Sequence, residues 1–245
     1  MLVACGLIIS PGFFGPAAFA QLLDSFALEQ QHSYHSVKEA MTDPDHVYRL
    51  DLRKNKLNKI PEEVFQLRNL QELLLQKNKI TEIPSALYDM TNLQILNLSD
   101  NKIDTISPDI GKLVNMKQLY LSGNKIKNIP GEIGKMREMR ILDLSKNELY
   151  ALPSSIGNMT HLRNLILNTN RIDSLPHTVG QLKALYYLDL WGNNVWFFPD
   201  EITSIRHNLK YLDMRVIALR REYQETIQEQ LPYTEIYFSV GCNCH

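Results

Sequence analysis

Cysteine is scarce in this sequence: the 245 residues contain three, at Cys5, Cys242 and Cys244. Cys242 and Cys244 are separated by one residue, so they cannot join distant parts of the chain, and a disulfide framework is excluded. Together with His245 they could supply three metal ligands. A fourth ligand at a spacing typical of zinc sites is missing, so we predict no metal site. A local disulfide and free thiols both stay open for this pair.

The sequence also has no excess of positive charge. Its 26 Lys and Arg residues and 27 Asp and Glu residues give a formal net charge of -1, and they form no Lys/Arg-rich block. This balance argues against nucleic acid or an anionic membrane as a partner. The sequence motifs of phosphate-binding loops, zinc proteases and serine hydrolases are missing as well. We therefore expect a protein that is not an enzyme and carries no cofactor.

Charged residues are absent from residues 1–20, which are mostly apolar. The segment ends in Ala18-Phe19-Ala20 before Gln21, a pattern typical of signal-peptide cleavage sites. Proline and glycine interrupt it too often for a convincing membrane span. We predict an export signal here, and hence a secreted, periplasmic or cell-surface protein. No basic residue precedes the apolar part, so a lipid anchor, a disordered or packed N-terminus and a cytoplasmic protein remain alternatives.

What the sequence has in abundance is repetition. An asparagine recurs every 23 residues, at Asn55, Asn78, Asn101, Asn124, Asn147, Asn170 and Asn193. We expect each of them to turn inward where its strand ends, because its amide can both donate and accept and can satisfy backbone groups of its own and adjacent units. Aligning on it gives seven full units over residues 47–208, each with seven apolar columns, and a partial eighth unit from Leu209. Alternation such as Leu50-Asp51-Leu52 predicts a short strand with one buried face. One unit cannot enclose its own apolar side, so we expect stacked units with a continuous core.

The consensus of these units is LxxLxLxxNxLxxLPxxIGxL. The third unit carries its first half from Leu93 to Ile103, and pairs such as Ile156-Gly157 and Val179-Gly180 carry its second half. This pattern resembles the 23-residue form of the leucine-rich repeat, which is found in Ras-binding scaffolds, plant intracellular repeat proteins and exported bacterial repeat proteins. The resemblance implies an α/β solenoid with a parallel sheet on its concave side. It implies a binding scaffold but names no ligand.

A solenoid must cover its terminal apolar faces. Ser36-Val-Lys-Glu39 is a capping-box pattern that would start a short helix, so we predict a helical N-terminal cap over residues 21–46. Leu219, Tyr223, Ile227 and Leu231 fall on one face of a second helix before Pro232. Alternation at Ile236, Phe238 and Val240 predicts a final strand. Residues 209–245 therefore form the partial eighth repeat and a C-terminal cap.

The concave side is where we expect a partner to bind. Its outward columns are charged in the N-terminal third and become aromatic towards the C-terminal end. Aromatic residues with a polar tip are favoured in interface cores. The predicted contact residues are Tyr120, Ile166, Tyr187, Asp189, Trp191, Tyr211 and Asp213. The alternative is that the C-terminal cap folds over the rings at this end and makes them part of the core.

Trp196 and Phe197 interrupt a column pair that is mostly polar in the other units, for example Asp173-Ser174. Clustered exposed rings are unfavourable without a cover. We interpret them as a bed for the C-terminal cap, with a partner-binding patch at the edge as the alternative.

The sequence as a whole predicts a monomeric, non-enzymatic module that binds a protein or peptide ligand on its concave face. Two alternatives remain: an intracellular signalling scaffold that uses the same surface, and a non-catalytic subunit of an enzyme complex.

Overall fold

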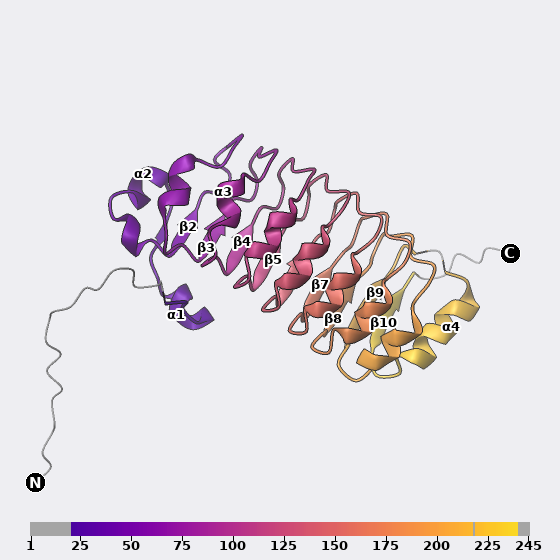
Figure 1. Ribbon diagram of the computed structural model, residues 1–245. Coiled ribbons are helices and arrows are strands. Elements are labelled where there is room, and N and C mark those ends of the chain that lie inside the picture. Colours follow the sequence, from indigo (N-terminus) through magenta and orange to yellow (C-terminus); the bar gives the residue numbers. More distant parts are fainter. Residues whose placement is uncertain (1–20, 218, 240–245) are drawn as a thin grey trace, which may run out of the picture.

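The protein is a row of stacked repeats built on one parallel sheet of ten strands (Figure 1). The computed structural model describes residues 21–217 and 219–239. Neighbours in the sheet follow one another in the sequence, which confirms the predicted α/β repeat solenoid. The strands are β1 (Ser33–Tyr34), β2 (Arg49–Asp51), β3 (Glu72–Leu74), β4 (Ile95–Asn97), β5 (Gln118–Tyr120), β6 (Ile141–Asp143), β7 (Asn164–Ile166), β8 (Tyr187–Asp189), β9 (Tyr211–Met214) and β10 (Glu235–Phe238).

The sheet register follows directly from the repeat. Arg49 in β2 lies opposite Glu72 in β3, and the same offset of one unit holds as far as β8. Each sequence column therefore becomes a row of neighbouring side chains across the sheet. The apolar columns form one continuous core, in which only Leu57, Ile83 and Met90 of the full units are half-buried rather than buried.

A short helix forms the opposite side of each full unit (Figure 1). These helices are η2 (Glu62–Gln66), α3 (Ser85–Tyr88), η3 (Pro108–Lys112), η4 (Gly131–Lys135), η5 (Ser154–Asn158), η6 (His177–Gln181) and η7 (Asp200–Ile205). A proline precedes six of them and fixes the backbone for the turn. In the third unit the proline comes one residue late, as the first residue of η3. Ser107 precedes it there, and its side chain accepts a hydrogen bond from the Asp109 N–H at 3.2 Å.

The repeated asparagines form a ladder of buried hydrogen bonds. The Asn124 amide donates to the carbonyls of Leu98 in the preceding unit (3.0 Å) and Leu121 in its own unit (2.9 Å). Its oxygen accepts from the N–H of Ile103 at 3.0 Å. Asn55 is the exception, because no preceding repeat offers it partners and it is exposed. The expectation that all seven asparagines turn inward is therefore wrong for the first.

The N-terminal cap consists of α1 (Ser25–Glu29), β1, α2 (Val37–Ala40) and η1 (Pro44–His46). Ser36 caps α2 as predicted, and its oxygen accepts from the Glu39 N–H at 3.1 Å. The Glu39 carboxylate accepts from the His35 N–H instead of the Ser36 N–H that a capping box would use. Ala40 is buried in the core, and Tyr34, Val37 and Met41 pack against it and close it at this end.

At the other end, α4 (Arg221–Gln230) and β10 lie where the sequence predicted a helix and a strand. Ile227 and Leu231 are buried, but the Tyr223 side chain is exposed, so the predicted apolar face of α4 is narrower than expected. β10 pairs with β9 and extends the sheet by one strand. Val240, Cys242, Cys244, His245 and the predicted export signal over residues 1–20 lie outside the described residues.

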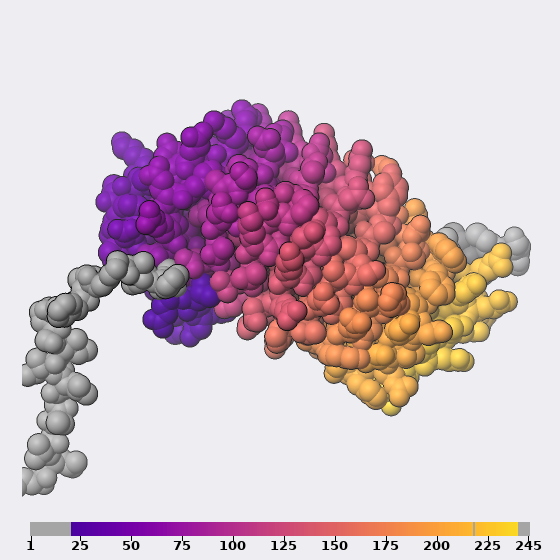
Figure 2. All heavy atoms as spheres, viewed as in Figure 1, coloured from indigo at the N-terminus to yellow at the C-terminus, as the bar shows by residue number. Residues whose placement is uncertain are grey.

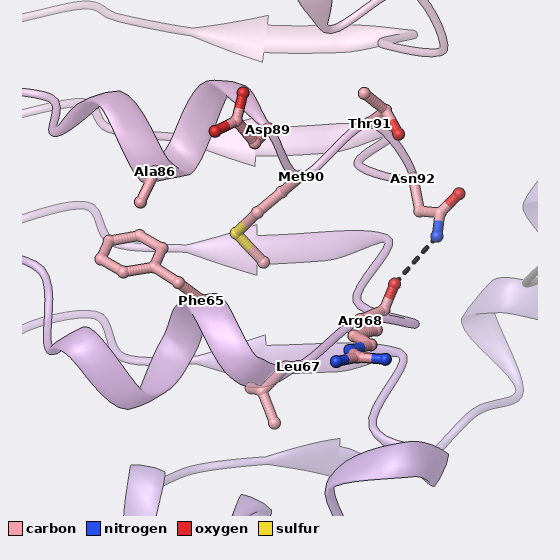
Figure 3. A pocket seen from close by; sticks show the side chains of 8 residues that line it. All are labelled: Phe65, Leu67, Arg68, Ala86, Asp89, Met90, Thr91 and Asn92. Carbon is pink, nitrogen blue, oxygen red and sulfur yellow. Dashed lines mark hydrogen bonds between the residues drawn. The ribbon is translucent and has the colours of Figure 1, made fainter.

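The helix-bearing face follows the curve of the array from one end to the other (Figure 2). Four units have a glycine in their helices, and a Cβ on Gly180 would lie 2.3 Å from the Glu201 carbonyl oxygen. Phe65 takes this position in the first unit and leaves a crevice of about 160 Å³ between η2 and α3 (Figure 3). Ligand pockets usually exceed about 300 Å³, so this crevice is a packing gap.

Candidate functional site

We call one surface of the sheet the sheet face. It is formed by the side chains that point away from the core, both on the strands and on the two residues after each strand. It corresponds to the side that the resemblance given above implies to be concave. Apart from Tyr120 on β5, its aromatic residues lie at the C-terminal end, on β8, β9, β10 and their flanks. We call Tyr186, Tyr187, Trp191, Tyr211 and Tyr237 the C-terminal aromatic surface.

Three of these rings are in contact. Tyr211 packs edge-on against Tyr186, with ring centroids 5.4 Å apart, and lies 6.5 Å from Tyr187. Burial raises the pKa of the Tyr187 hydroxyl, and the Asp189 and Asp213 carboxylates add to the effect. Tyr187 is therefore a neutral phenol that can donate a hydrogen bond at physiological pH.

The other two rings belong to Trp191, two residues after β8, and to Tyr237 on β10. Trp191 is 38% exposed, and within the described residues its ring contacts no other aromatic ring. Tyr237 is 40% exposed and lies under the Arg215 guanidinium, 5.8 Å from its ring centroid. Because β10 lies beside β9 rather than across it, the described part of the C-terminal cap widens this surface and does not cover it.

The two predicted contact carboxylates at this end are engaged within the protein. Asp189 is almost fully buried, and its Oδ1 accepts from the backbone N–H of Trp191 at 3.0 Å. Its Oδ2 accepts from the Asn168 amide at 2.7 Å. Both oxygens of Asp213 accept from Arg215. These carboxylates hold the turn after their strands and are buried, whereas the neighbouring aromatic rings are partly exposed.

The same turn bond recurs wherever this column holds Asp or Asn. Asp51, Asn97 and Asp143 each accept from the N–H two residues on, at 3.1, 3.0 and 3.0 Å. Short polar side chains commonly satisfy nearby backbone groups in this way. Tyr120 and Ile166 occupy the same column without this role. Both are half-buried, and the Tyr120 hydroxyl donates to Gln118 at 2.9 Å.

At the N-terminal end, ion pairs cover the sheet face. Arg49 binds Glu72 with Nε–Oε2 at 2.7 Å and also donates to the Glu29 carbonyl. Arg53 binds Asp51 through both carboxylate oxygens. Burial tends to raise the pKa of Asp51, but the hydrogen bonds and charge of Arg53 lower it below its ordinary value.

Trp196 and Phe197 lie on the edge just beyond the sheet face. Trp196 is 63% exposed and Phe197 is 48% exposed, and their rings lie 5.9 Å apart. The interpretation of these rings as a bed for the C-terminal cap is therefore wrong, because α4 and β10 leave them open to solvent. The alternative of a partner-binding patch at the edge stays a prediction.

Three residues of this region were missed at the sequence level. Tyr186 precedes β8 and lies outside the columns expected to face a partner, yet its ring packs on Tyr211. Tyr237 joins the sheet face only because β10 pairs in register with β9. Arg215 pairs with Asp213, a contact that the sequence analysis did not predict. The alternation of Ile236 and Phe238, which predicted the final strand, already indicated that Tyr237 between them points to the other side of the sheet.

Two searches of the described residues bear on other functions. No three His, Cys, Asp or Glu side chains come together there in a way that could hold a metal ion. Among the helices of that part of the chain, none has the length and apolar character needed to cross a membrane.

The chain belongs to the leucine-rich repeat family. The family model described as "Leucine rich repeat" matches residues 45–103, 91–149 and 137–195, which together span more than half of the 245 residues. A comparison with curated protein sequences gives no match. Leucine-rich repeat proteins serve mostly as binding scaffolds with diverse ligands.

Solved structures similar to this chain include two plant receptors. One is the ectodomain of the membrane receptor kinase GASSHO1/SCHENGEN3 from Arabidopsis thaliana in complex with CASPARIAN STRIP INTEGRITY FACTOR 2, with a TM-score of 0.60 and 28% identity over 65% of this chain. Another is the plant peptide hormone receptor RGFR1 in complex with RGF2, with a TM-score of 0.63 and 29% identity over 74% of this chain. The matches span 20% and 30% of those receptor chains.

Internalin C2 from Listeria monocytogenes is similar over more of its length. It has a TM-score of 0.70 and 20% identity, with 81% of this chain and 83% of that chain covered. At this identity the likeness concerns the fold alone.

Proposed function

We propose that the protein binds a protein or peptide ligand on its concave sheet face, without catalysis, and that the C-terminal aromatic surface is the anchor. The observation that carries this proposal is the contrast along one face: charged side chains pair with each other at the N-terminal end, while aromatic rings stay accessible at the C-terminal end. Partly exposed tyrosine and tryptophan are typical of interface anchors.

Two further observations support this choice. Tyrosine and tryptophan offer a large apolar contact area together with a hydrogen-bonding tip, which suits the side chains and backbone of a peptide. The two receptor structures at 28% and 29% identity were each solved in complex with another molecule, as their names state.

The test is selection of binders from a random dodecapeptide phage library on the immobilised protein. We expect selected peptides to lose at least about tenfold in affinity for a Tyr187→Ala/Trp191→Ala variant, because each truncated anchor usually weakens binding by more than 1 kcal/mol. A Tyr150→Ala/Tyr223→Ala variant is the matched control, since it removes two exposed aromatic rings that lie off the sheet face. Thermal unfolding of both variants separates a loss of binding from a loss of folding.

Two results would contradict the proposal. One is equal weakening of binding by the two variants. The other is a loss of stability in the Tyr187/Trp191 variant with unchanged binding per folded molecule. Equal binding by both variants and the unsubstituted protein would move the anchor elsewhere on the molecule.

We further propose that the protein is exported and acts as a monomer outside the cytoplasm. The support is the uncharged, apolar segment 1–20 with its Ala18-Phe19-Ala20 ending. N-terminal sequencing of the mature protein checks this: Gln21 as the first residue supports export, and Met1 favours an intracellular scaffold. Sedimentation of the mature protein measures the oligomeric state.

A further inference from the structure

One row of side chains runs along the edge of the sheet face without belonging to it. We call it the edge row. Each member comes one residue before a strand, and each donates its backbone N–H to the carbonyl of the member before it. These bonds measure 2.8 Å from Arg140 to Lys117, 2.9 Å from Arg163 to Arg140 and 2.8 Å from Tyr186 to Arg163. Strand spacing therefore holds the members about 4.8 Å apart. In order they are Tyr48, Gln71, Gln94, Lys117, Arg140, Arg163, Tyr186 and Lys210.

The chain itself covers the first part of the edge row. The Gln71 amide donates to the Gln21 carbonyl at 3.1 Å, and its oxygen accepts from the Leu23 N–H at 2.9 Å. One step further along, the Gln94 amide donates to the Leu23 carbonyl at 2.9 Å. Residues 21–23 thus run along the row as an extended segment whose peptide groups are held by side-chain amides. Both glutamines are buried as a result.

The next three members are all cationic. Lys117, Arg140 and Arg163 follow one another, with Lys117 half-buried and both arginines exposed. Burial and the neighbouring Arg140 lower the pKa of Lys117, while Glu138 and Asp24 act in the opposite direction. Asp24 is the residue that follows the covering segment, so the segment ends with a carboxylate close to the first cation of the row.

These cations differ from the arginines on the sheet face in forming no ion pair. Arg49, Arg53 and Arg215 each form an ion pair with a carboxylate of the protein. Within residues 21–217 and 219–239, none of Lys117, Arg140 and Arg163 forms one. Like charges on neighbouring strands repel one another, so three adjacent cations favour a ligand that brings negative charge.

We propose that Lys117, Arg140 and Arg163 form a docking rail for an acidic, extended peptide segment. The proposal rests on the proposed function and gives the ligand a chemistry: carboxylates along the rail and an apolar or aromatic part on the C-terminal aromatic surface. The apolar part of the ligand is expected on the C-terminal aromatic surface because the edge row continues into it: Tyr186 follows Arg163 directly and packs on Tyr211. A peptide is favoured over other polyanions because residues 21–23 already bind the preceding members through their peptide groups.

The experiment uses the same random dodecapeptide library on the full chain and two charge-matched variants. The rail variant is Lys117→Gln/Arg140→Gln/Arg163→Gln. The control variant is Lys79→Gln/Lys102→Gln/Lys125→Gln, which removes three exposed cations at the same spacing from the opposite edge. We expect Asp and Glu to be enriched in peptides selected on the unsubstituted protein and the control variant, but not on the rail variant. A selected acidic peptide should bind the rail variant about tenfold more weakly, with the difference shrinking at high salt.

Equal acidic enrichment on both variants, or none on the unsubstituted protein, would overturn the rail. A thymidine dodecanucleotide provides a second test at physiological salt. The rail would also be overturned if the protein bound this oligonucleotide more tightly than the selected peptides and the rail variant no longer bound it. These outcomes are separable from failure of the aromatic anchor. If the rail variant loses binding while Tyr187→Ala/Trp191→Ala binds fully, the docking rail is supported and the aromatic anchor is contradicted. If Tyr187→Ala/Trp191→Ala loses binding while the rail variant binds fully, the anchor is supported and the rail is contradicted.

Discussion

Asp51 in β2 and Asp189 in β8 occupy the same repeat position, and each accepts a hydrogen bond from the backbone N–H two residues on. The residue at that second position is Arg53 at one end and Trp191 at the other. Arg53 folds back on its aspartate and covers it, whereas Trp191 stays partly exposed and brings no charge. The repeat therefore fixes the turn, and one neighbouring side chain decides whether the surface above it is closed or open.

The difference extends to the flanking strands. At the N-terminal end, Arg49 is tied to Glu72 and to carbonyls of the cap, so the sheet face there is linked to the protein's own first residues. At the C-terminal end, the cap strand β10 adds Tyr237 to the face. Each cap adds a strand to the sheet, but the N-terminal cap engages the side chain of Arg49, whereas the C-terminal cap adds a partly exposed aromatic ring. For this reason we locate ligand binding at the C-terminal end.

The largest expected effect tests the scaffold that both ends share. Asn124→Ala removes a buried amide that donates to Leu98 and Leu121 and accepts from Ile103. Buried backbone groups left without partners each cost about 1–3 kcal/mol, so we expect a loss of about 3 kcal/mol or more in the free energy of unfolding. Denaturant unfolding followed by circular dichroism measures it.

Asn55→Ala is the matched control at the N-terminal end. The side chain is exposed, so we expect a change below about 0.5 kcal/mol. Similar losses for the two variants would mean that the ladder does not hold the interior units together.

A smaller effect, of opposite sign at the two ends, is expected from the paired aspartates. Asn keeps the turn bond, as Asn97 does in the third unit. Asp51→Asn removes the charge that binds Arg53, which is half exposed, and we expect a loss of about 1 kcal/mol at neutral pH. Burial raises the pKa of Asp189, so Asp189→Asn should leave stability unchanged or raise it by up to about 1 kcal/mol.

The pH dependence separates the two aspartates further. Asp51 has a lowered pKa, so its contribution is present above the pKa of the unfolded chain and is lost as pH falls through the folded-state pKa. Asp189 has a raised pKa, so its contribution is present below the unfolded pKa and is lost as pH rises through the folded-state pKa. Both variants should approach the unsubstituted protein in strongly acidic solution, below the folded-state pKa of Asp51, and diverge from it, in opposite directions, towards neutral pH. Parallel curves would contradict this assignment.

The sequence was sufficient for the scaffold because the repeat encodes it many times. A fixed spacing of 23 residues determines which residues meet across the sheet, so the register, the core columns and the asparagine ladder all follow from one alignment. The error at Asn55 has the same origin. The column is uniform in sequence, but the first unit lacks the neighbour that the bonds require.

The surface was harder to predict because its contacts are not repeated. Leu23 meets Gln94 across 71 positions, and residues 21–31 have no periodicity that would place them on the edge row. The turn role of Asp189 could have been found, since Asp and Asn often bond to a backbone N–H two residues on. Whether a cap covers a ring depends on the path of one segment that occurs once in the chain. The alignment of the repeats therefore gives no information about it.

The last expected effect, also small, concerns the edge that carries Trp196 and Phe197, where the first unit has polar residues instead. Trp196 and Phe197 hold the positions of Asn58 and Lys59 in the first unit. Trp196→Asp introduces the residue of the preceding unit, Asp173, and should change the free energy of unfolding by less than about 1 kcal/mol, because most of the ring is already in solvent. A covered bed would instead lose about 3–5 kcal/mol on removal of a buried tryptophan. Denaturant unfolding distinguishes these values, and a loss in the larger range would restore the cap as the cover of this edge. If stability is kept while a selected peptide binds more weakly, the edge joins the ligand-binding surface at the C-terminal end.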